Sequence, residues 1–174
     1  IGVYRQKPQP ARVPELVRAA SRLGLFGDPE SAGAYVGFIA GVLGSNPDRA
    51  EELVAAMFPL PPEDHWMVVR AVAYSGLPDW KEMLNRFSDR MPTRQAMIEK
   101  YVEGKMPTLI AIAPPKERSF GEKVKGLLSS DKKDDKSVIW AMDSSPELLD
   151  VLWGYYFATG SYAPIHRMIA MLHW

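Results

Sequence analysis

The spacing of apolar residues constrains the fold of this chain more than any other feature of its sequence. Apolar residues recur three and four positions apart, which is the period of an α-helix, and no segment alternates polar and apolar residues as a half-buried strand does. Fifteen prolines and 13 glycines interrupt this pattern at short intervals, and such residues end one helix and allow the next to begin. The sequence therefore predicts an all-α fold built from short helices.

The prolines and glycines also set the boundaries of the predicted segments. Residues 1–13 form an extended, Pro-rich lead-in, and residues 14–174 form a single helical domain. The predicted helices are 14–23, 32–43, 48–57, 63–76, 79–90, 94–103, 120–128, 147–158 and 164–172. A Pro-rich break near 105–118 separates the sixth helix from the rest. The polar, mixed-charge stretch 129–136 is predicted to be a mobile loop, because it offers nothing to bury.

Weak internal repetition suggests how the helices are arranged. The triplets Asn46-Pro47-Asp48 and Leu77-Pro78-Asp79 align at an offset of 31, and each joins an apolar helix to an amphipathic one. Such pairs bury their apolar faces on their neighbours, so we expect stacked helical hairpins in an α-solenoid-like fold. An irregular helical bundle is the alternative. In the predicted helix 32–43, Gly33, Gly37 and Gly41 fall along one side, where we expect another helix to approach closely.

Composition excludes several classes of protein. The chain has 21 Lys and Arg against 21 Asp and Glu, so its net charge of zero gives no basic footprint for nucleic acid. It has no cysteine, which excludes disulfides, thiolate zinc sites, iron–sulfur clusters, covalently attached haem and cysteine nucleophiles. No apolar stretch approaches the roughly 20 residues of a membrane-spanning helix. We therefore expect a soluble protein without a membrane-spanning segment and without a cofactor.

Three strings carry a resemblance to a known family: residues 60–64 (LPPED), 71–78 (AVAYSGLP) and 152–162 (LWGYYFATGSY). With them the chain resembles an uncharacterised family of exported bacterial α-helical proteins with tetratricopeptide-like repeats, over about Val13 to Trp174. The resemblance implies a helical-repeat fold and a periplasmic or otherwise exported location. The non-Met start at Ile1 would fit removal of a secretory signal. The resemblance brings no activity and no catalytic residue.

The histidines do not form a recognisable site. His65 follows Glu63 and Asp64, but neighbouring residues of a helix do not face one another, and acidic residues in a first helical turn are expected for electrostatic reasons. His166 and His173 are seven residues apart, whereas one metal ion needs a spacing of about four on a helix. Serine-nucleophile and phosphate-loop motifs are absent from the sequence. We predict no catalytic residue and no metal site.

Aromatic residues are concentrated in the predicted helix 147–158 and just after it. Trp153, Tyr155, Tyr156, Phe157 and Tyr162 fall within ten residues, more than one side of a helix can hold. Trp153, Tyr156 and Phe157 share one face and are predicted to pack in the core, whereas Tyr155 points elsewhere. We therefore expect Tyr155 and Tyr162 to line a groove for a peptide or a polymer such as a glycan.

Asp150, one turn before the aromatic run, completes the candidate binding residues Tyr155, Tyr162 and Asp150. The functional prediction is a non-enzymatic helical-repeat module that binds a protein or peptide partner in the cell envelope, with self-association as a further prediction. The alternative is a cell-envelope enzyme that acts on glycan, with carboxylates that only the fold brings together.

Overall fold

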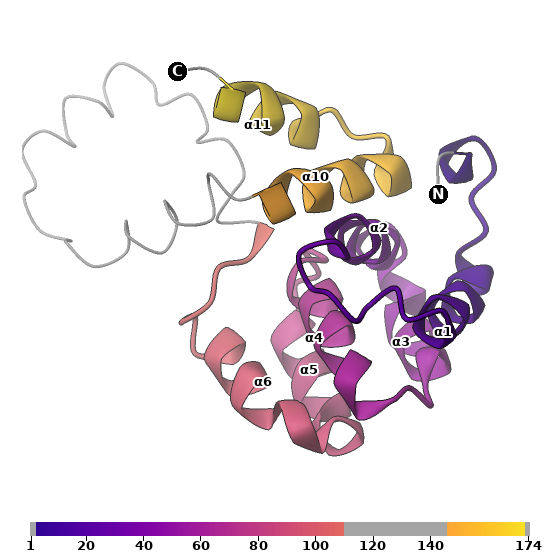
Figure 1. Cartoon of the computed structure of the whole chain (residues 1–174), viewed down its shortest axis with the longest axis vertical. Helices are drawn as coiled ribbons and strands as arrows, with labels where there is room; N and C mark the ends of the chain where they lie inside the picture. The colour runs from indigo at the N-terminus through magenta and orange to yellow at the C-terminus, as the bar shows by residue number, and fades with distance from the viewer. Residues whose placement is uncertain (1–2, 110–145, 173–174) are drawn as a thin grey trace, which may run out of the picture.

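A computed structural model of the chain describes residues 3–109 and 146–172. These residues form helices and contain no strand, which confirms the predicted all-α fold for the described part of the chain (Figure 1). No helix among them is both long and apolar enough to cross a membrane. The predicted helix 120–128, the predicted loop 129–136 and most of the predicted break 105–118 lie outside the described residues.

Prolines start several of the helices, as the sequence predicts. The α-helices are α1 (Val13–Arg22), α2 (Gly33–Gly44), α3 (Ala50–Met57), α4 (His65–Ala73), α5 (Trp80–Phe87), α6 (Gln95–Val102), α10 (Pro146–Thr159) and α11 (Ala163–Leu172). The single-turn 3-10 helices are η1 (Tyr4–Gln6), η2 (Pro10–Arg12), η3 (Pro47–Arg49), η4 (Pro62–Asp64), η5 (Ser88–Arg90) and η6 (Pro92–Arg94). Four of these turns begin with proline, whose fixed φ and missing N–H suit a first helical position, and each leads directly into an α-helix.

The lead-in differs from its prediction. Residues 4–12 were predicted to be extended, but they contain the two turns η1 and η2 and pack on the domain. Tyr4 supplies the reason, because its ring meets the ring of Phe38 on α2 edge to face, with centroids 5.0 Å apart. Contact with an aromatic ring of the core therefore overrides the extended preference of the prolines.

Helix α2 lies at the centre of the described structure. It packs against α10 on one side and α4 on the other, and α11 and α5 form the next layers outwards (Figure 1). Val36, Phe38, Ile39, Val42 and Leu43 are all buried, although they point in different directions around the helix. A helix that is apolar all round belongs in a core, and both faces of α2 are covered here.

Glycines bring α2 and α10 into direct backbone contact. A Cβ atom at Gly37 would overlap the carbonyl oxygen of Val151, and one at Gly154 would overlap the carbonyl oxygen of Ala34. Gly33 also meets α10, so the close approach predicted from the row of glycines on α2 is confirmed. The partner helix comes from the far end of the chain. A regular stack would place sequence neighbours side by side, so the solenoid-like arrangement stays a prediction.

Replacing Gly37 by alanine should therefore destabilise the protein by about 3 kcal/mol or more, because the new methyl group forces α10 away from α2. Gly76→Ala is the matched control. Gly76 has a φ of 75° and no atom close to an added Cβ, so the cost there is conformational, about 1–2 kcal/mol. Urea unfolding of both variants measures the difference. A Gly37→Ala protein as stable as the original would contradict the close contact.

Helix α6 is anchored by a buried tyrosine pair. Tyr101 is 1% exposed, and its hydroxyl lies 3.4 Å from the hydroxyl of Tyr74, which follows α4. The rings meet edge to face, with centroids 6.2 Å apart. Burial, with the neighbouring Tyr74, raises the pKa of Tyr101 well above its usual value, since a phenolate there would be desolvated.

This raised pKa predicts a loss of stability in alkaline solution. Above about pH 10 the unfolded state releases the Tyr101 proton and the folded state keeps it, so stability present below pH 10 falls as the pH rises, by about 1.4 kcal/mol per pH unit. Urea unfolding between pH 8 and pH 11.5 measures this slope. Tyr101→Phe removes this titrating group and should make the slope less steep by that amount. An equal slope in both proteins would exclude Tyr101 as its source.

Candidate functional site

Helix α10 presents two different faces. Val151, Gly154 and Ala158 face α2 and are buried. Tyr155 lies on the same side, half-buried against the core, with its hydroxyl 3.4 Å from the position of a Cβ at Gly44. This burial raises the pKa of Tyr155. The side of α10 that faces α2 is therefore built from small residues and one tyrosine.

The other face carries a connected group of aromatic rings, Trp153, Tyr156, Phe157 and Tyr162, which we call the aromatic surface. The Trp153 ring lies 6.0 Å from that of Tyr156 and stacks on that of Phe157 at 5.9 Å. Tyr162, between α10 and α11, extends the group with its ring 6.2 Å from that of Tyr156. Trp153 is 43% exposed and Tyr162 is 66% exposed. The two exposed rings are thus joined through the partly buried ring of Tyr156, and Phe157 packs against the core.

Arg5 of the lead-in holds one of these rings in place. Its Nη1 donates a hydrogen bond of 2.7 Å to the hydroxyl of Tyr156, and its guanidinium lies 5.0 Å from the centroid of the same ring. Arg5 is itself exposed and forms no ion pair within the described part of the chain. The aromatic surface therefore has a cation at its edge.

The predicted faces of α10 were wrong for Trp153 and Tyr155. Trp153 was assigned to the core and is among the most exposed apolar residues of the described structure, whereas Tyr155 faces α2. The physical reason is that α10 is apolar on nearly all sides, so the helical period does not select a face. Gly154 selects it, because only a glycine admits the α2 backbone. Matching Gly154 to the glycine row of α2 was the signal that sequence reasoning missed.

The three predicted binding residues lie in different places. Tyr162 belongs to the aromatic surface, whereas Tyr155 lies on the α2 side of α10, so the two do not line one groove. Asp150 is exposed near the start of α10, and its Cβ approaches Gly33 of α2. Tyr162 is therefore the predicted residue that joins the exposed rings, and its role in binding stays a prediction.

A cavity of about 410 Å³ with a mixed apolar and charged lining lies beside α4, lined by Phe26, Glu63, Asp64, Trp66, Arg70 and Arg94 among others. Three of its side chains bond to other segments of the fold, although the Nε atoms of Arg70 and Arg94 are buried without a hydrogen-bond partner among the described residues. Ser21 donates a hydrogen bond of 2.5 Å to the buried carboxylate of Asp64, and Arg94 donates to the backbone oxygen of Glu63 at 2.9 Å. Arg70 forms an ion pair with Glu147 of α10. These contacts join segments of the fold, which is a structural role.

His65 has a structural role of the same kind. It is 5% exposed, and its Nε2 donates to the backbone oxygen of Leu60 at 3.0 Å. Asp64 bonds to Ser21 instead, so the two neighbours form no acid–base pair. His166 is exposed, and His173 lies outside the described residues. Within residues 3–109 and 146–172, no cluster of three or more His, Cys, Asp or Glu side chains is arranged to hold a metal ion.

Compared with protein-family models, with curated proteins and with solved structures, the chain matches none. The resemblance to exported tetratricopeptide-like proteins therefore stays a prediction. The aromatic surface is interpreted below from its own geometry.

The corrected faces make a direct prediction about stability. Tyr155→Ala should destabilise the protein by about 2–3 kcal/mol, because it removes a ring packed against the core. Trp153→Ala should cost only about 1 kcal/mol, the worth of its contacts with Tyr156 and Phe157. Thermal and urea unfolding of both variants test this order. A larger loss for Trp153→Ala would restore the faces predicted from the sequence.

Proposed function

We propose that this chain is a non-enzymatic module that binds a protein or peptide partner through the aromatic surface. The observation that carries the proposal is the exposure of Trp153 and Tyr162 within one connected group of rings. Exposed large apolar residues that lie together mark interaction sites more often than isolated ones do. Tryptophan and tyrosine are also the side chains that most often dominate the binding energy of protein interfaces.

The rigidity of α10 supports the same proposal. The backbone contact with α2 fixes the helix that carries three of the four rings, and Arg5 fixes Tyr156 from the other side. Binding to a surface whose side chains are already ordered loses less conformational entropy than binding to a mobile one. The aromatic surface is thus preorganised for binding.

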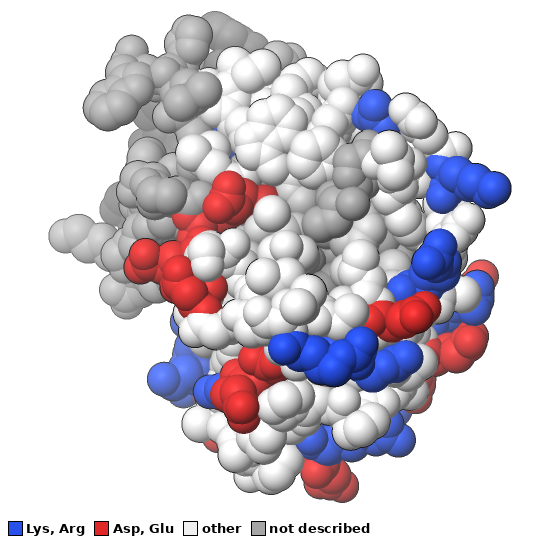
Figure 2. All heavy atoms as spheres, turned by 45° about the vertical axis from the view of Figure 1, so that its right-hand side comes forward, with Lys and Arg blue, Asp and Glu red and all other residues white. Residues whose placement is uncertain are grey.

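Charge around the aromatic surface indicates the chemistry of the partner. Residues 151–165 contain no Asp, Glu, Lys or Arg, and Figure 2 shows few charged side chains over the upper part of the molecule, where α10 and α11 lie. Arg5 at the edge offers hydrogen-bond donors and a positive charge. The favoured partner is therefore a peptide segment with apolar side chains for the rings and a carboxylate for Arg5.

The finer parts of the proposal come from the sequence. A helical-repeat architecture and a place in the cell envelope follow from the resemblance to exported proteins. Self-association is the case in which the partner is a second copy of this chain. The glycan enzyme remains the alternative, since aromatic rings also stack on sugars. The structural roles of Asp64 and His65 give it no added support.

A selection from a phage-displayed peptide library tests the proposal. Synthetic copies of the selected peptides are titrated against the protein, with fluorescence anisotropy as the readout. Trp153→Ala and Tyr162→Ala should each weaken binding about tenfold or more, because they remove exposed anchor rings and little of the fold. Leu23→Ala is the matched control, since Leu23 is 74% exposed on another element and its loss should leave affinity unchanged.

Two outcomes would contradict the proposal. The first is a library that yields no binder, or binders whose affinity Trp153→Ala and Leu23→Ala change equally. The second is saturable binding of oligosaccharides on a glycan array that Trp153→Ala abolishes, which would move support to the glycan alternative.

A further inference from the structure

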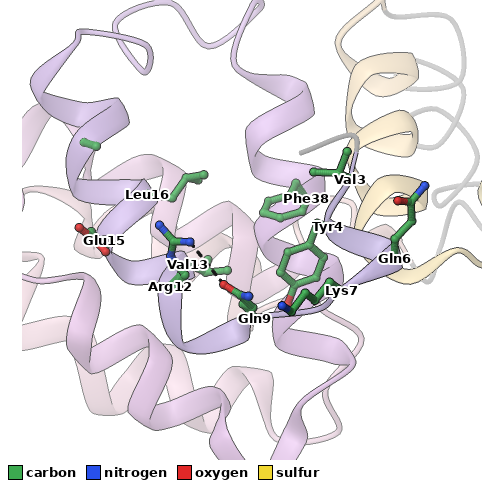
Figure 3. Close-up of a pocket in the computed structure, with 11 residues that line it drawn as sticks. Val3, Tyr4, Gln6, Lys7, Gln9, Arg12, Val13, Glu15, Leu16 and Phe38 are labelled. Carbon is green, nitrogen blue, oxygen red and sulfur yellow. Dashed lines mark hydrogen bonds between the residues drawn. The ribbon is translucent and has the colours of Figure 1, made fainter.

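A second cavity, separate from the aromatic surface, lies between the lead-in and helices α1 and α2 (Figure 3). Its volume of about 630 Å³ is within the range of small-molecule sites. Val13 and Leu16 of α1 form one wall, and Phe38 of α2 with Val3 of the lead-in forms the other. The cavity therefore has apolar walls that suit the body of an apolar ligand. We call it the lead-in cavity.

Tyr4, one of the residues that line the lead-in cavity, has a buried hydroxyl without a hydrogen-bond partner. The ring of Tyr4 lies between Phe38 and Lys7 in Figure 3, and its hydroxyl is enclosed but bonds to no described residue. An enclosed hydroxyl that forms no hydrogen bond is costly, and most such groups have a partner. Burial also raises the pKa of Tyr4, so the hydroxyl keeps its proton and can donate it in a hydrogen bond. An acceptor on a bound molecule would satisfy it.

The charged groups of the cavity favour an anion. Lys7 and Arg12 both line it, and neither forms an ion pair with a described acidic residue. Arg12 makes only a long hydrogen bond, 3.4 Å, to the side chain of Gln9. Glu15 is the acid of the lining, and in Figure 3 it lies beyond Arg12, on the side away from Tyr4. Two cations against one acid leave the cavity with a net positive charge.

We propose that the lead-in cavity binds a small amphipathic carboxylic acid, with an apolar body and a single carboxylate. The apolar body lies between Leu16 and Phe38. The carboxylate accepts a hydrogen bond from the hydroxyl of Tyr4 and is neutralised by Lys7 and Arg12. Charge-assisted hydrogen bonds to a carboxylate are about twice as strong as neutral ones, which gives the charged head its selectivity.

Isothermal titration calorimetry with octanoate, 1-octanol and octylammonium tests the proposal on the intact chain, with each probe below its aggregation limit. Octanoate should bind with one-to-one stoichiometry. The alcohol, which shares the chain but lacks the charge, should bind about tenfold more weakly. The ammonium ion should show no saturable binding. Equal affinity for octanoate and octanol, or no saturable octanoate binding, would overturn the proposal.

Variants locate the site. Tyr4→Phe should weaken octanoate binding about tenfold. The double variant Lys7→Ala/Arg12→Ala should weaken octanoate binding about tenfold and leave octanol binding unchanged, because the alcohol carries no charge. Arg22→Ala is the matched control, since Arg22 is an exposed cation at the end of α1 and does not line the cavity. Ala19 lines the cavity from α1, so the larger side chain of Ala19→Leu should weaken the binding of both octanoate and octanol.

The thermal unfolding midpoint separates loss of the site from loss of the fold. Without ligand, Tyr4→Phe should unfold at the same temperature as the original protein or higher, because the lost hydroxyl has no partner. Trp153→Ala should leave octanoate affinity unchanged, because Trp153 does not line the lead-in cavity. The octanoate site and the proposed peptide site are therefore tested independently. Octanoate binding that responds to Trp153→Ala or Arg22→Ala, and not to Tyr4→Phe, would overturn the assignment to this cavity.

Discussion

The backbone contact between α2 and α10 is the interaction on which the rest of the structure depends. Helices with ordinary side chains at their contact lie about 8–10 Å apart, and glycines at Gly37 and Gly154 allow a closer approach. Many more atom pairs then come within van der Waals range, each worth little but together substantial. The contact joins two helices that are about 100 residues apart in the sequence, and it decides which side of α10 remains exposed to solvent. The aromatic surface exists because the glycine side is turned inwards.

The lead-in depends on the same contact, because it is tied to both helices. Tyr4 packs on Phe38 of α2, and Arg5, the next residue, bonds to Tyr156 of α10. Two neighbouring side chains thus point to different elements and hold the turn η1 across them. The lead-in cavity lies on the Tyr4 side and the aromatic surface on the Arg5 side, so one short segment contributes to both proposed sites.

The sequence predicted what local chemistry controls and missed what distant contacts control. Asn46-Pro47 correctly placed the start of a helix, because proline acts on its own backbone. The glycine row on α2 predicted a close neighbour, but not which helix it would be. The face of Trp153 could not be predicted, since α10 is apolar on nearly all sides and only its fit to α2 selects one. Likewise, the prolines of the lead-in do not predict that Tyr4 packs on Phe38 of α2.

A helix contact made largely by glycine has few interlocking side chains, so other contacts must fix the position of α10 along α2. Polar contacts near the two ends of α10 provide this. Near its start, Glu147 pairs with Arg70 of α4, and both side chains are mostly buried, where a mismatched charge would be costly. Towards its end, Tyr156 accepts the hydrogen bond of Arg5. A shift of one helical turn would break both, whereas the apolar contact alone would tolerate it better. Close packing thus brings the helices together, and the two polar contacts set their register.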